Sequence, residues 1–411
     1  MKCRCCGKNI NNILLDLNFS PLANSYIKKP INKNFFEKYY PLVVYYCKKC
    51  WFVQANTIND PKDIFNNDYA YLSSASSTFL KHCEQFTKEI VDKLKLDEKS
   101  FVLEIASNDG YLLNLFNAAN IPNLGIEPTK STADIALKKG VKTIKKFFDF
   151  KLSKLLNKKY GKADLVVANN VYAHVPNIID FTKGINKILK KEGIVCIEFP
   201  HFQNLLKNNL FDTIYHEHYS YLALHSVLNI FNKCNLKIFD VKKINTQGGS
   251  LRIYGCKNNS NYKTSKNVFK ILNEEKKYGL LDDKMYKNYN KKILKLKISS
   301  LTFLLNQKKM KKKIAIYGAA AKGNTFLNYL KISKDIIDVA FDSSEYKINT
   351  LMPGSLIKIE DPKYISKYKP NLIVILPWNL FDEITSFLSK KIYWKCELIT
   401  FLPKFKTMKL N

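Results

Sequence analysis

Apolar runs that alternate with amphipathic helical stretches are the feature that most constrains the fold of this 411-residue chain. The runs comprise residues 100–105, 123–126, 163–168, 193–199, 313–317, 337–341 and 371–376. Alternation of this kind predicts parallel sheets with helices on both faces. We therefore expect an α/β protein with two separate sheets, because the runs fall into one set in the middle of the chain and another near its end.

Three regions follow from this pattern. Residues 1–68 hold clustered cysteines and several prolines, which is typical of a small loop-rich module. Residues 69–262 contain the first set of strands. Residues 263–411 begin with a lysine-rich stretch whose only glycine before residue 310 is Gly279, and we expect one or two exposed helices there. A second, smaller α/β unit should follow these helices.

Four cysteines in the first region have the spacing of a metal site. Cys3 and Cys6 form one C-x-x-C pair, and Cys47 and Cys50 form another. Four thiolates in tetrahedral arrangement suit zinc and leave no coordination position open for catalysis. The sequence therefore predicts a structural zinc ion that stabilises a module too small to have a secure core of its own. Cys5 is expected to be a bystander.

The net charge of +32 would ordinarily suggest a nucleic acid or an anionic membrane as partner. Among the 67 basic residues, however, only Arg4 and Arg252 are arginine, and the lysines are spread along the whole chain. Biased codon usage explains this pattern better than a phosphate-reading surface, where arginine is preferred. No stretch of 18 apolar residues and no signal peptide is evident. We expect a cytoplasmic protein with no nucleic-acid or membrane partner.

The loop after the first strand of the middle region points to an adenosyl cofactor. Residues 104–110 lead from the strand into a helix, and Gly110 is the loop's only glycine, so it is a poor cradle for a pyrophosphate. S-adenosylmethionine carries no phosphate. Seventeen residues beyond Gly110, Glu127 stands where a carboxylate can accept both ribose hydroxyls. The candidate cofactor-binding residues are Glu104, Ala106, Asn108, Gly110, Glu127 and Asn169.

Residues 213–221 combine two histidines, one carboxylate and three phenols. His216 and His218 would share one side of an extended strand, which allows a metal site. Acid/base chemistry is the favoured alternative, because an imidazole titrates near neutral pH and a neighbouring carboxylate fixes its tautomer. A polar rim at the start of a helix is the third interpretation. His174 lies just after Asn169 and by itself indicates little.

Taken together, these segments resemble the sugar-nucleotide C-methyltransferases, over essentially the whole chain and in the same order. The resemblance rests on the four cysteines and on residues 104–110 (EIASNDG), 125–128 (GIEP), 173–176 (AHVP), 198–201 (EFPH), 211–218 (FDTIYHEH), 248–252 (GGSLR) and 318–324 (GAAAKGN). It implies a zinc-binding amino-terminal module, a central Rossmann-like methyltransferase domain of class I that binds S-adenosylmethionine, and a second Rossmann-like domain that contributes to sugar-nucleotide binding.

The resemblance also implies roles for individual residues. The histidine matching His218 is the base in this family, and the positions of Glu217, Tyr215 and His174 line the reacting sugar. A tyrosine from residues 68–74 enters the same site, for which we choose Tyr69 over Tyr71, two residues away. Two departures stand out: Gln247 replaces a common histidine, and Trp51 follows Cys50 where glycine is commoner. An extended strand would put His218 and Glu217 on opposite sides, so a local bend is required.

These features predict an enzyme that methylates a ring carbon beside the ketone of a nucleotide-linked 4-keto-deoxysugar, in the biosynthesis of a surface polysaccharide or another glycoconjugate. Arg252, Lys322 and Asn324 are the candidate residues for binding the sugar nucleotide, and we expect a monomer or weak dimer. Two alternatives are an RNA methyltransferase, which does not explain the His-Glu-His run, and a nonenzymatic zinc-stapled binding protein.

Overall fold

The computed structural model describes residues 1–29, 31, 35–56, 61–64, 72–75 and 77–410. They group into two compact units, and each unit is built from separate stretches of the chain. Unit 1 comprises residues 1–11, 46–202 and 218–281, and unit 2 comprises residues 12–45, 203–217 and 282–411. The amino-terminal region is therefore divided between the units, with both cysteine pairs in unit 1.

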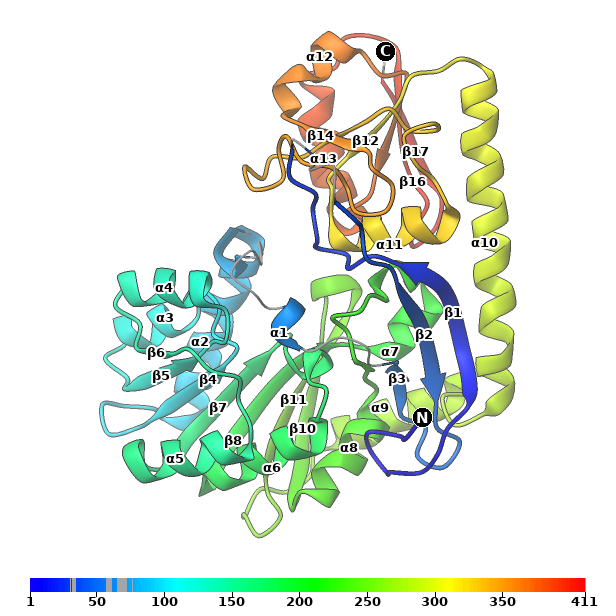
Figure 1. Cartoon of the computed structure of the whole chain (residues 1–411). Helices are drawn as coiled ribbons and strands as arrows, with labels where there is room; N and C mark the ends of the chain where they lie inside the picture. Colours follow the sequence, from blue (N-terminus) through cyan, green and yellow to red (C-terminus); the bar gives the residue numbers. More distant parts are fainter. Residues whose placement is uncertain (30, 32–34, 57–60, 65–71, 76, 411) are drawn as a thin grey trace. The chain divides into compact units, whose positions relative to one another are not determined.

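A seven-stranded sheet in the order β10-β11-β8-β7-β4-β5-β6 forms the centre of unit 1 (Figure 1). Its strands are β4 (Val102–Ile105), β5 (Asn123–Ile126), β6 (Thr143–Ile144), β7 (Ala163–Asn169), β8 (Leu189–Pro200), β10 (Leu236–Ile244) and β11 (Ser250–Lys257). The first five are parallel where they pair. The four strands expected in the middle region and the Rossmann-like fold are thus confirmed.

The two edge strands β10 and β11 run antiparallel to each other, and β11 runs antiparallel to β8. The alternation of apolar runs and helical stretches predicted only a parallel sheet. The difference has a physical reason, because a short turn at Thr246–Gly248 joins β10 to β11 and a connection of that length can join only antiparallel strands. Gly248 and Gly249 both have positive φ there.

Helices cover both faces of this sheet (Figure 1). They are α2 (Ser77–Leu94), α3 (Leu113–Ala118), α4 (Lys130–Lys138), α5 (Phe150–Tyr160), α6 (Ile178–Ile188), α8 (Leu224–Lys233) and α9 (Lys266–Tyr278). Helices α5, α6 and α8 pack side by side on one face, and α2 and α3 pack together on the other. Phe86 of α2 and Phe116 of α3 are buried in the core on their side of the sheet. Unit 1 also contains α1 (Pro61–Ile64) and the antiparallel pair of β3 (Val53–Ala55) and β9 (Ser220–Tyr221).

Unit 2 contains a six-stranded sheet in the order β14-β13-β12-β15-β16-β17, in which only β17 pairs antiparallel. The strands are β12 (Ile314–Tyr317), β13 (Val339–Phe341), β14 (Lys358–Glu360), β15 (Leu372–Ile375), β16 (Cys396–Thr400) and β17 (Lys406–Leu410). The helices are α7 (Phe202–Lys207), α10 (Asp283–Lys309), α11 (Ala321–Leu330), α12 (Ile365–Tyr368) and α13 (Phe381–Ser389). Strands β1 (Asn12–Ser20) and β2 (Tyr40–Tyr46) add to this unit. The expected second α/β unit is confirmed.

A buried carboxylate caps helix α8 of unit 1. Ala223 precedes this helix and has no side-chain oxygen, so the first backbone N–H groups need an acceptor from elsewhere. Glu275 of α9 supplies it, accepting hydrogen bonds from the backbone N–H of Leu224 (2.6 Å) and of His225 (3.0 Å). His201 Nε2 (2.7 Å) and His225 Nδ1 (2.8 Å) bind the same carboxylate. Glu275 therefore fastens α9 to α8.

We expect Glu275→Gln to lower the free energy of unfolding by about 3 kcal/mol at neutral pH. Burial disfavours the charged form, but the bonds from His201 and His225 outweigh it and lower the pKa of Glu275 to about 2. A carboxyl group with a lowered pKa stabilises the fold above its unfolded value of about 4.5, and this contribution is lost as pH falls towards about 2. Thermal melts between pH 6 and about pH 2.5 should show a flatter pH dependence in the variant. The neighbouring, more exposed Glu274→Gln should keep the wild-type slope; equal slopes in all three proteins would contradict the prediction.

Candidate active site

The four cysteines converge in unit 1 as the spacing predicts. The sulfur atoms of Cys3, Cys6, Cys47 and Cys50 all lie within 4.8 Å of one another. Cys3 Sγ lies 3.5 Å from Cys50 Sγ, and Cys6 Sγ lies 3.6 Å from Cys47 Sγ. A regular tetrahedron with zinc–sulfur bonds of about 2.3 Å has sulfur–sulfur edges of about 3.8 Å. The donor set and its dimensions therefore fit a structural zinc ion.

The two cysteine pairs have matching turns. The N–H of Gly7 donates to the carbonyl of Cys3 (2.8 Å), and the N–H of Trp51 donates to that of Cys47 (2.7 Å). Both residues have positive φ, 75° for Gly7 and 55° for Trp51. The departure noted at Trp51 thus places a bulky residue in a backbone conformation that favours glycine.

The loop after β4 has a left-handed backbone at alternate residues. The φ angles are 58° at Ala106, 49° at Asn108 and 76° at Gly110. The N–H of Asn108 donates to Glu127 Oε2 (3.0 Å), and the N–H of Thr129 donates to Glu127 Oε1 (2.8 Å). These bonds fix the carboxylate of Glu127 beside the loop while each oxygen keeps a lone pair for a further donor.

Unsatisfied acceptors gather at the same edge of the sheet. Both carboxylate oxygens of Glu104 and the side-chain oxygen of Asn169 are buried without a hydrogen-bond partner among the described residues. Glu104 is the last residue but one of β4, and Asn169 is the last residue of the neighbouring strand β7. Burial raises the pKa of Glu104 well above its usual value; Tyr111 opposes this shift, and the charges of Glu127 and Asp109 add to it. Buried acceptors of this kind require donors, and the amino and hydroxyl groups of S-adenosylmethionine are donors, so these residues fit the cofactor.

Ala106→Gly should raise the free energy of unfolding by about 0.5–1 kcal/mol. A left-handed backbone costs a non-glycine residue about 1–2 kcal/mol, and the extra freedom of glycine in the unfolded chain offsets part of that gain. Thermal denaturation would show the gain as a higher Tm. Ala168→Gly in β7 is the matched control, because Ala168 has no positive φ and its replacement should lower the Tm. A lower Tm for both variants would refute the role of backbone strain at Ala106.

His174 and His218, two of the candidate catalytic residues, lie together in unit 1. Their ring centroids are 4.6 Å apart with an interplanar angle of 64°, and both side chains are half-buried. Tyr221, which was not among the candidate site residues, is edge-on to His218 at 6.4 Å. Its buried hydroxyl has no hydrogen-bond partner among the described residues. The two imidazoles are thus close together and flanked by a phenol.

Tyr215, His216 and Glu217 belong to unit 2, next to His218 in the chain. His216 and Glu217 form a turn, so the bend that the sequence analysis required is present. His216 is buried with Nε2 3.3 Å from the carbonyl oxygen of Tyr40, and burial lowers its pKa. Glu217 is 3% exposed and accepts a hydrogen bond from Asn24 Nδ2 (2.6 Å). Tyr69 and Tyr71 lie outside the described residues.

The structure does not support a metal site in this histidine-rich segment. Within the described ranges, the four-cysteine cluster is the only group of three or more histidine, cysteine or acidic side chains that converges closely enough to hold a metal ion. Acid/base chemistry remains the favoured interpretation of His218.

Arg252, a candidate phosphate ligand, is 3% exposed in the core of unit 1. Its Nε donates to Glu198 Oε1 (2.5 Å), and its guanidinium lies 4.3 Å from the ring centroid of Phe86. His82 Nε2 binds the other oxygen of the same carboxylate (3.0 Å). These contacts give the arginine a role within the fold, and its part in substrate binding stays a prediction.

The other two candidate substrate residues are on α11 of unit 2. Lys322 Nζ donates to Asn379 Oδ1 (2.7 Å) and lies 4.5 Å from the ring centroid of Trp378. Burial lowers the pKa of Lys322, although the charge of Asp212 opposes the shift. Asn324 is 1% exposed and donates to the carbonyl of Ala23 (2.7 Å). Both side chains are thus engaged by residues of their own unit.

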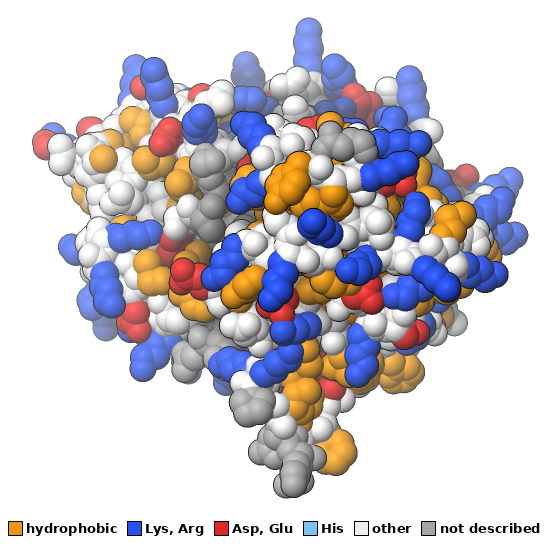
Figure 2. Space-filling model, turned by 90° about the horizontal axis from the view of Figure 1, so that it is seen from above, with side chains coloured by type: hydrophobic (Ala, Val, Ile, Leu, Met, Phe, Trp, Pro, Cys, Tyr) orange, Lys and Arg blue, Asp and Glu red, His pale blue; other side chains and the backbone are white. Residues whose placement is uncertain are grey.

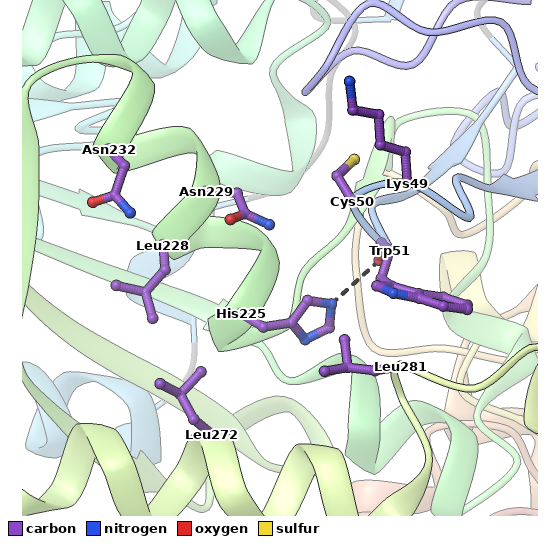
Figure 3. Close-up of a pocket in the computed structure, with 9 residues that line it drawn as sticks. All are labelled: Lys49, Cys50, Trp51, His225, Leu228, Asn229, Asn232, Leu272 and Leu281. Carbon is purple, nitrogen blue, oxygen red and sulfur yellow. Dashed lines mark hydrogen bonds between the residues drawn. The ribbon is translucent and has the colours of Figure 1, made fainter.

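A pocket of about 400 Å³ lies beside the second cysteine pair in unit 1 (Figure 3). It is lined by Lys49, Cys50, Trp51, His225, Leu228, Asn229, Asn232, Leu272 and Leu281. His225 points towards Trp51, with Nε2 3.4 Å from its carbonyl oxygen (Figure 3). Cys50 is the only candidate site residue in this lining, so the pocket is not the expected reaction site.

Lysine side chains are scattered over the face shown in Figure 2 and do not gather in one stripe. A nucleic-acid-binding surface usually concentrates its positive charge. Among the described residues, no helix is both long and apolar enough to cross a membrane.

Known families match three stretches of the chain. A zinc binding domain matches residues 3–65, a methyltransferase domain matches residues 79–241, and a C-methyltransferase C-terminal domain matches residues 245–403. The chain belongs to the C-methyltransferase family. This C-methyltransferase is therefore an S-adenosylmethionine-dependent enzyme, and the alternative of a nonenzymatic binding protein is wrong.

Three individual proteins are similar to this chain. The C-methyltransferase is 27% identical over 383 residues to C-methyltransferase NovU of Streptomyces niveus, covering 93% of this chain and 91% of that protein. A solved S-adenosylmethionine-dependent methyltransferase from Clostridium acetobutylicum has 14% identity and a TM-score of 0.36, covering 43% of this chain and 91% of its own. Magnesium protoporphyrin IX methyltransferase from Synechocystis has 14% identity and a TM-score of 0.36, covering 49% and 99%.

Proposed function

We propose that this C-methyltransferase methylates a ring carbon adjacent to the ketone of a nucleotide-linked 4-keto-deoxysugar, in the biosynthesis of a surface polysaccharide or another glycoconjugate. The observation that carries the proposal is the pair of half-buried imidazoles of His174 and His218, 4.6 Å apart and beside Tyr221. Transfer to carbon requires removal of a proton from that carbon, and a paired imidazole is suited to this task.

The proposed first step breaks the C–H bond beside the ketone. His218 accepts the proton, and the electron pair moves into an enolate whose charge lies largely on the former carbonyl oxygen. His174 or Tyr215 donates a hydrogen bond to that oxygen, and the carboxylate of Glu217, the preceding residue in the chain, stabilises the imidazolium of His218. The negative charge of the enolate is thereby stabilised by groups of the protein.

In the second step the enolate carbon forms the new C–CH₃ bond. When bound, S-adenosylmethionine would supply the methyl group of its sulfonium, and the electron pair of the S–CH₃ bond would stay with sulfur. Glu104, Ala106, Asn108, Gly110, Glu127 and Asn169 would hold this cofactor at the edge of the unit 1 sheet. His218 then releases its proton to water, which balances the reaction.

Labelled S-adenosylmethionine offered with a panel of nucleotide-activated 4-keto sugars would test the proposal. We expect label to enter at least one sugar at the carbon next to the ketone. In heavy water without methyl donor, the same carbon should exchange its proton for deuterium. Transfer of label to RNA, with none to any keto sugar, would overturn the proposal.

A further inference from the structure

The loop of unit 2 that resembles a nucleotide-binding loop is occupied by the chain itself. In Rossmann-like domains, the turn from the first strand into the following helix is where a bound nucleotide's phosphates lie. Here that turn joins β12 to α11. The hydroxyl of Tyr26 donates to the carbonyl oxygen of Ala319 (2.5 Å), and Asn324 Nδ2 donates to that of Ala23 (2.7 Å). Tyr26 is thus bonded to the loop, and Ala23 is bonded to the first turn of α11 that follows it.

The acidic residue that would face a ribose is also used internally. Asp342 follows β13, the strand next to β12. Its Oδ2 accepts a hydrogen bond from the N–H of Ala319 (2.7 Å), and its Oδ1 accepts one from the N–H of Ser344 (2.8 Å). The loop is therefore bonded to the carboxylate of Asp342, and the hydrogen bonds of both groups stabilise unit 2.

The same end of unit 2 also holds the segment that leads to Glu217. Thr325 Oγ1 of α11 donates to the carbonyl of Ile214 (3.1 Å), and Trp378 Nε1 donates to Asp212 Oδ2 (2.7 Å). Asp212 is 1% exposed. One of these bonds thus holds the backbone at Ile214 and the other holds the side chain of Asp212, both just before the candidate catalytic turn.

Asn24 connects residues 23–26 with the segment that leads to Glu217. It lies between Ala23 and Tyr26, whose positions are set by the loop, and its Nδ2 donates to Glu217 Oε1 (2.6 Å). A glutamate side chain has three rotatable bonds, and burial alone does not select among its rotamers. A hydrogen-bond donor whose backbone is fixed does select one rotamer, because the carboxylate must stay within reach of that donor.

We propose that Asn24 is a positioning residue for Glu217, and that the loop of the second α/β domain serves as the anchor of this contact. The inference rests on the proposed function, in which Glu217 stabilises the imidazolium of His218. It deepens that function by assigning a role to a residue distant in sequence and to a nucleotide-type loop.

Asn24→Ala should slow deuterium exchange at the acceptor carbon by about 100-fold, because misplacing a catalytic group by about 1 Å can cost that much. Asn24→Asp has the same shape but offers no donor and adds a like charge, so its loss should be at least as large. In both variants the KM for the sugar should stay within about threefold of wild type. Rates are expressed per molecule that binds S-adenosylhomocysteine, which removes the effect of unfolded protein.

Asn186→Asp is the matched control. Asn186 is a half-buried amide of unit 1 that donates to the backbone carbonyls of Cys234 (2.7 Å) and Asn235 (3.1 Å). Its replacement should lower the Tm and leave exchange per binding-competent molecule unchanged. Wild-type exchange in Asn24→Ala, or an equal loss in Asn186→Asp, would overturn the positioning role.

An activity-independent measurement separates this inference from the proposed function. Amide hydrogen exchange followed by mass spectrometry should show residues 210–217 exchanging several-fold faster in Asn24→Ala, with β7 unchanged. If residues 210–217 exchange faster in Asn24→Ala while the wild-type enzyme labels no keto sugar, the proposed function is wrong. The contact between Asn24 and Glu217 then has no catalytic role. If the wild-type enzyme labels a sugar while residues 210–217 keep wild-type exchange in Asn24→Ala, the positioning role alone is wrong.

Discussion

His218→Asn should lower turnover by about 10²–10⁴-fold, the usual contribution of a general base. Asparagine approximates the size of the imidazole but cannot accept a proton at neutral pH. Binding of S-adenosylhomocysteine, measured by calorimetry, should stay close to wild type, because the acceptors at the ends of β4 and β7 are unchanged. Deuterium exchange at the acceptor carbon should fall in parallel with methyl transfer, since both depend on the same proton removal.

His225→Asn is the appropriate control for this experiment. His225 contacts Glu275 and the carbonyl of Trp51 and is not among the candidate catalytic residues. The amide of asparagine can replace the donor at Nδ1, so we expect a modest loss of stability and unchanged turnover per folded molecule. Unchanged turnover in His218→Asn would remove this residue from the role of base.

Removal of zinc should unfold the cysteine-bearing part of unit 1. Structural zinc contributes about 10–16 kcal/mol of apparent folding free energy in zinc-finger peptides, which is comparable to the whole stability of a typical domain. We expect Cys47→Ser, or treatment with a strong chelator, to release the metal and to make residues 1–11 and 46–55 sensitive to protease. Metal analysis and limited proteolysis would follow the two effects.

Cys5→Ser provides the matched control for the zinc experiment. Cys5 is buried within the first C-x-x-C pair, but it is not a member of the four-sulfur cluster. The variant should keep its zinc and its protease resistance. Purified wild-type protein without bound zinc, or a Cys47→Ser variant as resistant as wild type, would contradict a structural role for the metal.

Local sequence patterns were sufficient to predict much of this fold. Residues 123–126 form a strand with the predicted bounds, because a short apolar run between turn formers has few alternatives. The cysteine pairs were predictable because tetrahedral thiolate coordination needs this spacing. The antiparallel edge at β10 and β11 was missed, because the direction of an edge strand depends on the length of a turn that composition does not mark.

The candidate site was predictable only where its residues share a motif. His218 and Glu217 stand in a dense run of titratable groups, whereas Tyr221 was one of three phenols in that run with nothing to single it out. Asn24 had no signal at all, since its contact with Glu217 joins residues 193 positions apart. Arg252 was singled out by its rarity, but the sequence could not show that Glu198 lies beside it.

The path of the chain has a consequence for how this enzyme is made in the cell. The polypeptide passes from one unit to the other near residues 11, 45, 202, 217 and 281. During translation, unit 1 lacks its last stretch until residue 281 has left the ribosome, and the early residues 12–45 must wait for strands made near the end of synthesis. Neither unit corresponds to a fragment that a single cut would liberate, so dissection of this enzyme calls for point variants in the intact polypeptide.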